Sequence, residues 1–506
     1  MKLYPFQKDM VDKFEYVPSV LCGDDMGTGK TFEALALDLR RRTKQLDGYK
    51  QTDCKTLIVT PSTVMSSWVD HIKAIWPGAK VAVINPKSRG VLIAQLQDNY
   101  HYYIIHWEAL RLIDELRDVH WWHIIADEVH RAKNRKAQQT QALWKLKTSY
   151  KTGLSGTPAD NAPQDLWAIL HWLYPRYWSS FWKFNNYYVK IQVHTKGACT
   201  AFTIKPDGEQ EMCGGYHKNG YQAVVGVAHV DELMSIIEPY YLRRLKEDVI
   251  GDLPDKYYTE IKVQLAPRQR RIYDQMRSNM LAWVGKHEHE PIAAPIVVAQ
   301  LVRLKQFALG YAELETFKRK NRETGIVEER QRVKLSEPSS KLDAVMQKIE
   351  DNPNRQVVVF SESKQIINLF SVRLQAARIP HVLLTGDTPQ TDRGGVVDSF
   401  QRGTARVFAG TIHAGGEGIT LTASSTVIFL DRTWNPSKNR QAEDRCHRIG
   451  QTNAVEVIDI IADDTVDRGR LQTIKLKWSW LKQLLGDKTV ENDDDLHTNM
   501  DEHASK

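Results

Sequence analysis

Residues 23–31 (GDDMGTGKT) combine the residue types that hold a phosphate group. Gly27 and Gly29 let backbone N–H groups come close to an anion, because neither carries a side chain that would block the approach. Lys30 supplies a cation for the β- and γ-phosphates, and the Thr31 hydroxyl is suited to bind Mg²⁺. The segment therefore predicts a site for a nucleoside triphosphate.

One position of this segment departs from the common phosphate-loop pattern, in which a glycine stands five residues before the Gly-Lys pair. Asp24 occupies that position, and Gly23 stands one residue too early. The residues that follow, TFEALALDLRRR, predict a helix whose N-terminal dipole favours a bound phosphate. A chance glycine-rich turn is the alternative, and the helix argues against it.

A pair of adjacent carboxylates, Asp127 and Glu128, follows an apolar run at residues 123–126 that predicts a buried strand. Desolvated carboxylates without a partner are costly, and a bound Mg²⁺ would offset that cost. We expect Asp127 to bind the metal and Glu128 to act as the base that polarises the attacking water. An exposed Asp-Glu pair is the alternative interpretation.

Two arginines, Arg445 and Arg448, lie three residues apart in the segment EDRCHRIGQ. If this segment is helical, as its composition allows, both guanidinium groups project from one face. Arginine holds a phosphate in a fixed geometry, yet no neighbouring segment offers a phosphate site. The alternative is a pair of surface charges that pair with Glu443 and Asp444.

The elements that would position these residues are strands followed by polar loops and helices. The first half contains TLIVTPSTVMSSW, HIIADEVHRA and KTGLSGTPADN, and the second half contains QVVVFSESKQIINLF, ARVFAGTIHAGGEG and STVIFLDRTW. Such βαβ units build parallel sheets, whose ligands bind at the carboxyl ends of the strands. We therefore predict an α/β fold with two parallel-sheet lobes, at residues 1–245 and 336–486.

The rest of the chain has a different composition. Residues 267–285 and 295–310 show helical periodicity and few strand signals, so we expect residues 246–335 to form a helical insertion between the lobes, with residues 315–335 as an exposed connection or helix tip. The acidic residues 487–506 are predicted to be disordered.

A small insert at residues 185–230 contains two histidines and two cysteines that could make a tetrahedral zinc site. Their spacing matches no standard zinc motif, and a plain β-hairpin is the alternative. The four candidate ligands are His194, Cys199, Cys213 and His217.

Composition and charge narrow the class of protein. The 506 residues exceed what one hydrophobic core supports, so two or three domains are expected. The formal net charge is +7, and residues 487–506 hold seven acids and two lysines, which leaves about +12 on residues 1–486. This basic body predicts a polyanion partner such as nucleic acid, with a solvated surface as the alternative.

Membrane association and export are not expected. No apolar run approaches the ~18 residues that span a bilayer, and the N-terminal MKLYPFQKDM has no apolar signal core. The five cysteines include no CxxC pair, which favours a reducing compartment over a disulfide framework.

Four of these segments, GDDMGTGKT, DEVH, GLSGTPADN and QAEDRCHRIGQ, together resemble the Swi/Snf-type DNA translocases of helicase superfamily 2. The resemblance extends to LYPFQKDMV, YLRRLKEDVIGDLPDK, SSKLDAVMQKI and DRTWNPSKN, in the family's order from residue 3 to about residue 475. Asp25, Thr28 and Val129 replace residues that are more usual in the family, and these changes are mild. The chain also lacks accessory modules, so a compact bacterial or phage member fits better than a nucleosome remodeller.

The resemblance implies two RecA-like lobes with ATP between them, where Arg445 and Arg448 of the second lobe reach the γ-phosphate held by the first. It implies nucleotide contacts at Gln7, Asp25, Met26, Gly27, Thr28, Gly29, Lys30, Thr31, Gly418 and Gln441, and Mg²⁺ at Thr31 and Asp127. It implies contacts to the nucleic-acid strand at Thr60, Pro61, Ser62, Thr411, Gly415 and Trp434. Ser155 and Thr157 would couple hydrolysis to movement.

The function that the resemblance implies is ATP-dependent translocation on double-stranded DNA, independent of base sequence. The protein would be a monomer in the cytoplasm of a bacterium or phage-infected cell, or in the nucleus if it is eukaryotic. A strand-separating DNA or RNA helicase with the same ATPase core is the main alternative. A nuclease and a non-catalytic DNA-binding module are further rivals, and the sequence shows no evident nuclease metal cluster.

Overall fold

The structure is a computed structural model of the 506-residue chain, and it divides into two compact units. It describes residues 3–44, 54–84, 91, 94–96, 98, 100–159, 162–194, 197–198, 202–204, 210–212, 216–217, 221–249, 251, 253–286, 294–320, 327–389, 391–415, 419–485 and 487. The first unit comprises Met1–Ile191, Val224–Leu253 and Lys477–Thr489, and the second comprises Gln192–Ala223, Pro254–Leu476 and Val490–Lys506.

A seven-stranded sheet forms the centre of the first unit, in the order β13-β1-β6-β5-β2-β4-β3. Each pair of neighbouring strands is parallel, as the strand–loop–helix pattern predicts. The strands are β1 (Ser19–Cys22), β2 (Thr56–Thr60), β3 (Val81–Val83), β4 (Tyr102–His106), β5 (His120–Asp127), β6 (Lys147–Leu154) and β13 (Tyr241–Leu242).

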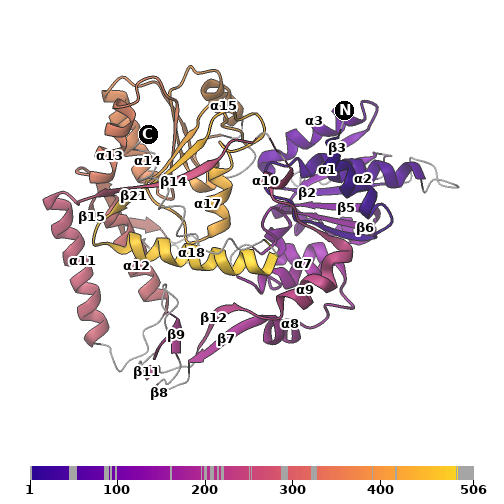
Figure 1. Ribbon diagram of the computed structural model, residues 1–506, viewed down its shortest axis with the longest axis horizontal. Helices are drawn as coiled ribbons and strands as arrows, with labels where there is room; N and C mark the ends of the chain where they lie inside the picture. The colour runs from indigo at the N-terminus through magenta and orange to yellow at the C-terminus, as the bar shows by residue number, and fades with distance from the viewer. Residues whose placement is uncertain are drawn as a thin grey trace. The chain divides into compact units, whose positions relative to one another are not determined.

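Helices cover both faces of this sheet, because alternate strand residues point to opposite sides. Leu57 and Val59 of β2 join one apolar core, and Ile58 between them joins another. One face is covered by α1 (Pro5–Phe14), α2 (Lys30–Lys44) and α3 (Met65–Ile75), and the other by α5 (Trp107–Leu110), α6 (Gln138–Trp144), α7 (Asp165–Leu173) and α9 (Val230–Ile237). Figure 1 shows α1, α2 and α3 on one side of the strands and α7 on the other.

The second unit contains a six-stranded parallel sheet in the order β14-β21-β20-β17-β19-β18. Its strands are β14 (Lys256–Val263), β17 (Val357–Ser361), β18 (His381–Leu384), β19 (Val407–Thr411), β20 (Thr426–Phe429) and β21 (Val455–Ala462). Its helices are α11 (Pro267–Lys286), α12 (Ala294–Leu309), α13 (Ser340–Glu350), α14 (Lys364–Ala376), α15 (Arg393–Gln401), α16 (Ile412–Gly415) and α17 (Pro436–Glu443). The predicted α/β fold with two parallel sheets is therefore confirmed.

The structure corrects the expectation that residues 246–335 hold few strands and end in an exposed connection or helix tip. Residues 256–263 form β14, the edge strand of the second sheet, in register with all eight residues of β21. Tyr311–Lys320 and Val327–Ser336 pair as the antiparallel strands β15 and β16. The sequence did not indicate this hairpin, because its strands are rich in charged residues. Strands with few apolar residues lack the alternation of apolar and polar positions by which a strand is identified.

The C-terminal helix α18 (Val466–Leu485) begins among residues of the second unit, and its residues from Lys477 onward belong to the first. Leu481, Leu484 and Leu485 are buried in a core of the first unit. The second lobe had been expected to extend over residues 336–486, so the unit boundary falls earlier than that expectation. Among the described residues, we find no helix whose length and apolarity would let it traverse a bilayer.

A buried charged network ties α2 to the amino ends of the strands in the first unit. The carboxylate of Asp38 accepts four hydrogen bonds, from Arg42 Nε (2.7 Å), His123 Nδ1 (2.9 Å), Tyr102 Oη (2.9 Å) and Thr56 Oγ1 (2.9 Å). Asp38 and His123 are fully buried. A carboxylate with this many donors needs no further partner, so the network is structural.

The geometry of this network makes His123 neutral. Its Nδ1 donates to Asp38, while its Nε2 lies 3.4 Å from Arg41 Nη1, which can only donate. Burial and the nearby Arg41 and Arg42 lower the pKa of His123 to about 4, although Asp38 opposes the shift. Burial alone would raise the pKa of Asp38, but Arg42 and His123 hold it below its usual range.

We expect the first unit to lose stability as the pH falls from about 6.5 towards 4. In that window an unfolded histidine binds a proton that folded His123 excludes, which costs ~3 kcal/mol for a pKa change from 6.5 to about 4. Urea unfolding followed by tryptophan fluorescence measures this, because ten of the 14 tryptophans lie in residues 1–191. His123→Asn should flatten the pH dependence, and His120→Asn, at an exposed position of the same strand, should not.

Candidate functional site

The phosphate loop runs from the carboxyl end of β1 to the start of α2, as predicted. Gly27 and Gly29 both adopt φ of 87°, in the left-handed region that favours glycine. Among the described residues, none accepts a hydrogen bond from the backbone N–H groups of residues 27–31. Five consecutive unpaired N–H groups at a helix N-terminus are what an anion requires.

Side chains hold the loop by donating hydrogen bonds to its carbonyl oxygens. Lys30 Nζ donates to the carbonyl oxygens of Asp24 (2.8 Å) and Asp25 (2.9 Å), and Thr28 Oγ1 also donates to Asp25 O (2.9 Å). Gln7 Nε2 donates to Thr28 O (2.9 Å), and a Cβ added at Gly29 would lie 2.6 Å from this Gln7 nitrogen. Gln7, a nucleotide contact implied by the resemblance, is therefore in contact with the loop.

A second segment holds the loop from outside. Gly23 N donates to Leu242 O (2.7 Å) and Asp25 N donates to Arg244 O (2.9 Å), so the chain that continues β13 pairs with the loop. The Arg244 guanidinium bridges the buried carboxylates of Asp24 and Glu33, at 2.9 Å from Glu33 Oε1. This pairing explains why an aspartate replaces the glycine of the common pattern at position 24.

The potential metal-binding atoms of Cys22, Asp24 and Glu33 lie within 4.8 Å of one another, close enough to share a metal ion. Burial and the charge of Asp24 raise the pKa of Glu33 to about 8. The guanidinium of Arg244 already supplies a cation to both carboxylates, so this cluster is a structural ion pair rather than a metal centre.

Asp127 ends β5, and its carboxylate is held by two side chains. Its Oδ2 accepts hydrogen bonds from Thr60 Oγ1 (2.8 Å) and Trp68 Nε1 (2.9 Å), and no described residue hydrogen-bonds to Oδ1. Burial and the adjacent Glu128 raise the pKa of Asp127 to about 6. A cation at Oδ1 would relieve the repulsion that raises this pKa, so the donor set fits Mg²⁺.

Glu128 adopts a left-handed conformation (φ 49°, ψ 52°), which is strained for a residue with a side chain. Its Oε2 lies 3.2 Å from His130 Nδ1, and that nitrogen lies 3.1 Å from Ser155 Oγ. Ser155 Oγ also accepts from Thr157 N (3.2 Å). Glu128 and the two predicted coupling residues are thus connected through His130.

Sequence reasoning missed four of these residues. Arg243 and Arg244 belong to the quoted segment YLRRLKEDV, but their partners lie far away in the sequence. Trp68 and His130 lie within the quoted segments TLIVTPSTVMSSW and DEVH, but neither was given a role. The signal that could have found the arginines is the improbability of two adjacent cations directly after a short apolar strand.

In the second unit, the arginine pair lies outside the helix that was expected to carry it. Helix α17 ends at Glu443, and Arg445 and Arg448 lie in the turns that follow. The two guanidinium groups still converge, because Nη1 of each lies 3.3 Å from the carbonyl oxygen of Ile419. The Glu443 carboxylate binds Lys256, Tyr258 and Arg432 instead, which excludes it as the partner of the pair.

The candidate strand contacts separate into accessible and inaccessible side chains. Thr60 is fully buried and donates to Asp127, so its side chain supports the carboxylate instead of reaching a nucleic acid, and Pro61 is also buried. Ser62 is exposed. Gly415 packs so closely on Phe360 that an added Cβ would lie 2.4 Å from its ring, which gives that glycine a structural role.

Three other predicted positions of the second unit are described. Thr411 ends β19 and is largely buried, Trp434 is half-buried, and Gln441 is buried on α17. Gly418, Cys199 and Cys213 lie outside the described residues, and the side chains of His194 and His217 are likewise not described, so the zinc hypothesis stays a prediction.

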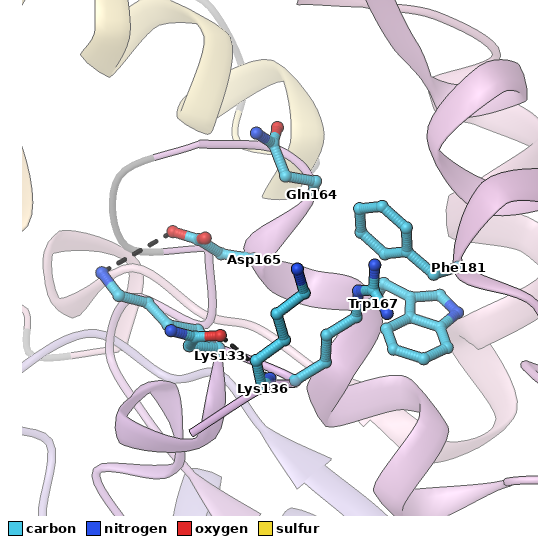
Figure 2. Close-up of a pocket in the computed structure, with 8 residues that line it drawn as sticks. Lys133, Lys136, Gln164, Asp165, Trp167 and Phe181 are labelled. Carbon is cyan, nitrogen blue, oxygen red and sulfur yellow. Dashed lines mark hydrogen bonds and ion pairs between the residues drawn. The ribbon is translucent and has the colours of Figure 1, made fainter.

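A separate cationic hollow of about 360 Å³ lies in the first unit. Figure 2 shows Lys133 reaching towards Asp165, at 3.7 Å between Nζ and Oδ2, with Trp167 and Phe181 on the other side. Arg135 lies over the Phe181 ring at 4.5 Å. None of the sequence-predicted site residues lines this hollow, and its cations are already partly engaged by these contacts.

Comparison with known proteins gives two matches to protein families. Residues 10–309 match the SNF2-related domain, and residues 340–450 match the helicase conserved C-terminal domain. The first range includes the phosphate loop and the Asp127–Glu128 pair, and the second includes Arg445 and Arg448.

Individual relatives cover most of this chain. The chromatin structure-remodeling complex subunit snf21 of Schizosaccharomyces pombe is 27% identical over 466 residues, which are 90% of this chain and 37% of that protein. The ATP-dependent helicase brm of Drosophila melanogaster is 27% identical over 474 residues, 90% of this chain and 27% of that protein. The chain thus spans about a quarter to two fifths of the length of these relatives.

Among solved structures, the SWI2/SNF2 ATPase core of Sulfolobus solfataricus in complex with dsDNA is 23% identical. The alignment covers 98% of this chain and 96% of that one, with a TM-score of 0.41.

We expect Gly29→Ala to weaken nucleotide binding at least tenfold, because the residue has a positive φ and the new Cβ would strike Gln7. Binding of ADP with Mg²⁺, measured by calorimetry, tests this. Gly394→Ala is the matched control, because Gly394 lies in α15 with no atom within 4 Å of an added Cβ. Equal affinity in both variants would contradict the assignment of this loop.

Proposed function

This chain belongs to the SNF2-related family of helicase superfamily 2, and from that premise we propose that it is an ATP-dependent motor that moves along double-stranded DNA. The single observation that carries the proposal is the row of five N–H groups at residues 27–31, beside Lys30, that have no partner in the described part of the chain. The SNF2-related match spans residues 10–309, which include this loop and the Asp127–Glu128 pair.

The residues of the first unit divide the chemistry of ATP hydrolysis among them. The N–H groups and Lys30 would bind the phosphates, and Glu128 would orient the attacking water and accept its proton. Asp127 and the Thr31 hydroxyl are the candidate ligands of Mg²⁺, which supplies charge neutralisation on the phosphate oxygens when bound. Trp68 and Thr60 fix the Asp127 carboxylate through Oδ2.

Arg448 is the strongest candidate for a contact to the transferring phosphoryl group. Its Nη1 donates to Ile419 O (3.3 Å) and Thr420 Oγ1 (3.1 Å), and no carboxylate among the described residues forms an ion pair with it. Burial lowers the pKa of this guanidinium, although Asp444 opposes the shift. A partly buried cation without a carboxylate favours an anionic ligand, and an arginine at a γ-phosphate can supply ~10³–10⁵ in rate.

Duplex DNA is proposed as the track for two reasons. Residues 1–486 carry about +12 of formal charge, and a basic surface binds the phosphate backbone independently of base sequence. The relatives of this chain include a chromatin-remodeling subunit and an ATP-dependent helicase. Binding should therefore weaken steeply with salt.

We expect Lys30→Ala and Glu128→Gln to abolish DNA-stimulated ATP hydrolysis while DNA binding survives. Both remove groups that act on ATP and leave the surface charge almost unchanged. Phosphate release with duplex DNA, single-stranded DNA, RNA and no nucleic acid measures this, with electrophoretic mobility shift for binding. Lys145→Ala, at an exposed position of the same unit, is the control and should behave as wild type. Persistent hydrolysis in both site variants would refute the site.

We expect Arg448→Ala to lower the turnover number at least a hundredfold with a smaller effect on ATP affinity, because a γ-phosphate contact acts mainly on the transition state. Steady-state kinetics with saturating duplex DNA separates the two effects. Arg402→Ala, an exposed arginine of the same unit, should change neither. A large loss of ATP affinity with normal turnover at saturation would contradict this role.

Translocation and strand separation are distinguished by their products. Displacement of a third strand from a triplex without unwinding of a forked duplex supports the translocase, and unwinding of the fork supports the alternative helicase.

A further inference from the structure

Arg243 connects three segments that sequence reasoning did not relate. Its Nη1 donates to the carbonyl oxygens of Gly23 (2.7 Å) and Gly156 (3.0 Å). Its Nε and Nη2 bind the carboxylate of Asp487, with 2.7 Å between Nη2 and Oδ2. Gly23 begins the phosphate loop, Gly156 lies between the coupling residues Ser155 and Thr157, and Asp487 follows α18.

The two carbonyl contacts join loops that pack closely on their neighbours. A Cβ added at Gly23 would lie 2.6 Å from Tyr241 Cε2, and one added at Gly156 would lie 2.6 Å from Met26 Cγ. The phosphate loop thus packs against both the Ser155–Thr157 loop and the strand β13, which Arg243 follows. The Arg243 guanidinium thus fixes the distance between the backbone at Gly23 and the backbone at Gly156, beside the candidate nucleotide site.

The carboxylate of Asp487 fixes the orientation of that guanidinium. Both side chains are only 5% exposed, and the two hydrogen bonds are bidentate, which is the geometry that most restricts an arginine. The hydrogen bonds to Asp487 also hold the pKa of Arg243 above its usual range, against the effect of burial.

The neighbouring Arg244 has a different set of partners. It binds Asp24, Glu33 and the Phe6 carbonyl, so the two arginines hold the phosphate loop from two separate groups of residues. Only Arg243 reaches the loop of Ser155 and Thr157 and the C-terminal segment. Its substitution should therefore affect the site in a way that a change at Arg244 does not reproduce.

We infer that Arg243, oriented by Asp487, is a positioning residue of the ATP site, and that the end of α18 is a structural component of that site. Because α18 begins among residues of the second unit, this contact gives the chain that leaves the second lobe a fixed attachment beside the phosphate loop. Arg243 acts on the site through the loop at Gly23 and through the loop at Gly156.

The inference rests on the proposed ATPase activity and is tested by steady-state kinetics and by binding of ADP with Mg²⁺. Arg243→Lys and Asp487→Asn should each raise KM for ATP and the dissociation constant of ADP by about tenfold or more, the effect of losing a hydrogen bond to a charged group. The turnover number at saturation should fall less. Asp487→Glu, which keeps the carboxylate, should restore most of the affinity.

The double variant Arg243→Lys, Asp487→Asn identifies the route of the effect. If Asp487 acts through Arg243, the double variant is no worse than Arg243→Lys alone, whereas independent roles give additive losses. Additive losses would overturn the assignment of Asp487.

Arg42→Lys is the matched structural control, because it also removes the fork of a buried arginine in the same unit, but at the amino ends of the strands. It should lower the melting temperature and leave KM and ADP affinity unchanged. If the Arg243 and Asp487 variants behave in the same way as this control, the contact only supports the fold and the inference is wrong. Failure of Lys30→Ala to abolish hydrolysis would instead refute the proposed site itself, so the two failures are distinguishable.

Discussion

A loop that keeps its backbone N–H groups unpaired for an anion cannot stabilise itself through those groups. The N–H groups of residues 27–31 bond to no described residue, so the loop is held through its carbonyl oxygens, its side chains and the N–H groups of Gly23 and Asp25. The side chains of Lys30, Thr28 and Gln7 donate hydrogen bonds to carbonyl oxygens of the loop. Arg243 donates to the carbonyl oxygen of Gly23, the first residue of the loop. The arrangement of the first unit around this loop follows from that constraint.

The same constraint explains the departure of this sequence from the common phosphate-loop pattern. A glycine at position 24 would offer no side chain, whereas Asp24 gives Arg244 an anchor at the base of the loop. Arg244 in turn satisfies Glu33 on α2, so the helix that follows the loop is tied to the strand segment beside it. The aspartate therefore places an ion pair where the common pattern has a glycine.

Much of the fold could be predicted because strands, polar loops and helices alternate along the chain, and the polar loops mark where each strand ends. The strand before Asp127 and the helix after Lys30 are local patterns that the sequence carries by itself. The two-residue strand β13 and the charged hairpin of β15 and β16 could not be predicted, because neither contains enough alternation to be distinguished from a loop.

The candidate site was predictable only as far as its chemistry-bearing residues. The partners that hold them, such as Trp68 on Asp127 and Arg243 on Gly23, come from segments 59 and 220 residues away. Spacing along a chain carries no information about such contacts. The arginine pair illustrates the same limit, since a helical spacing predicted the correct convergence of Arg445 and Arg448 although turns produce it.

Buried charge alone does not distinguish functional from structural residues in this protein, but the completeness of its hydrogen bonding does. At the amino ends of the first sheet, Asp38 accepts four hydrogen bonds and His123 is neutral, so that network is complete without a ligand. At the carboxyl ends, Asp127 Oδ1 and the N–H groups of the loop have no partner among the described residues. Asp127 and residues 27 and 29–31 are only partly buried, so these groups stay open to a ligand, whereas the network at the amino ends is buried and complete.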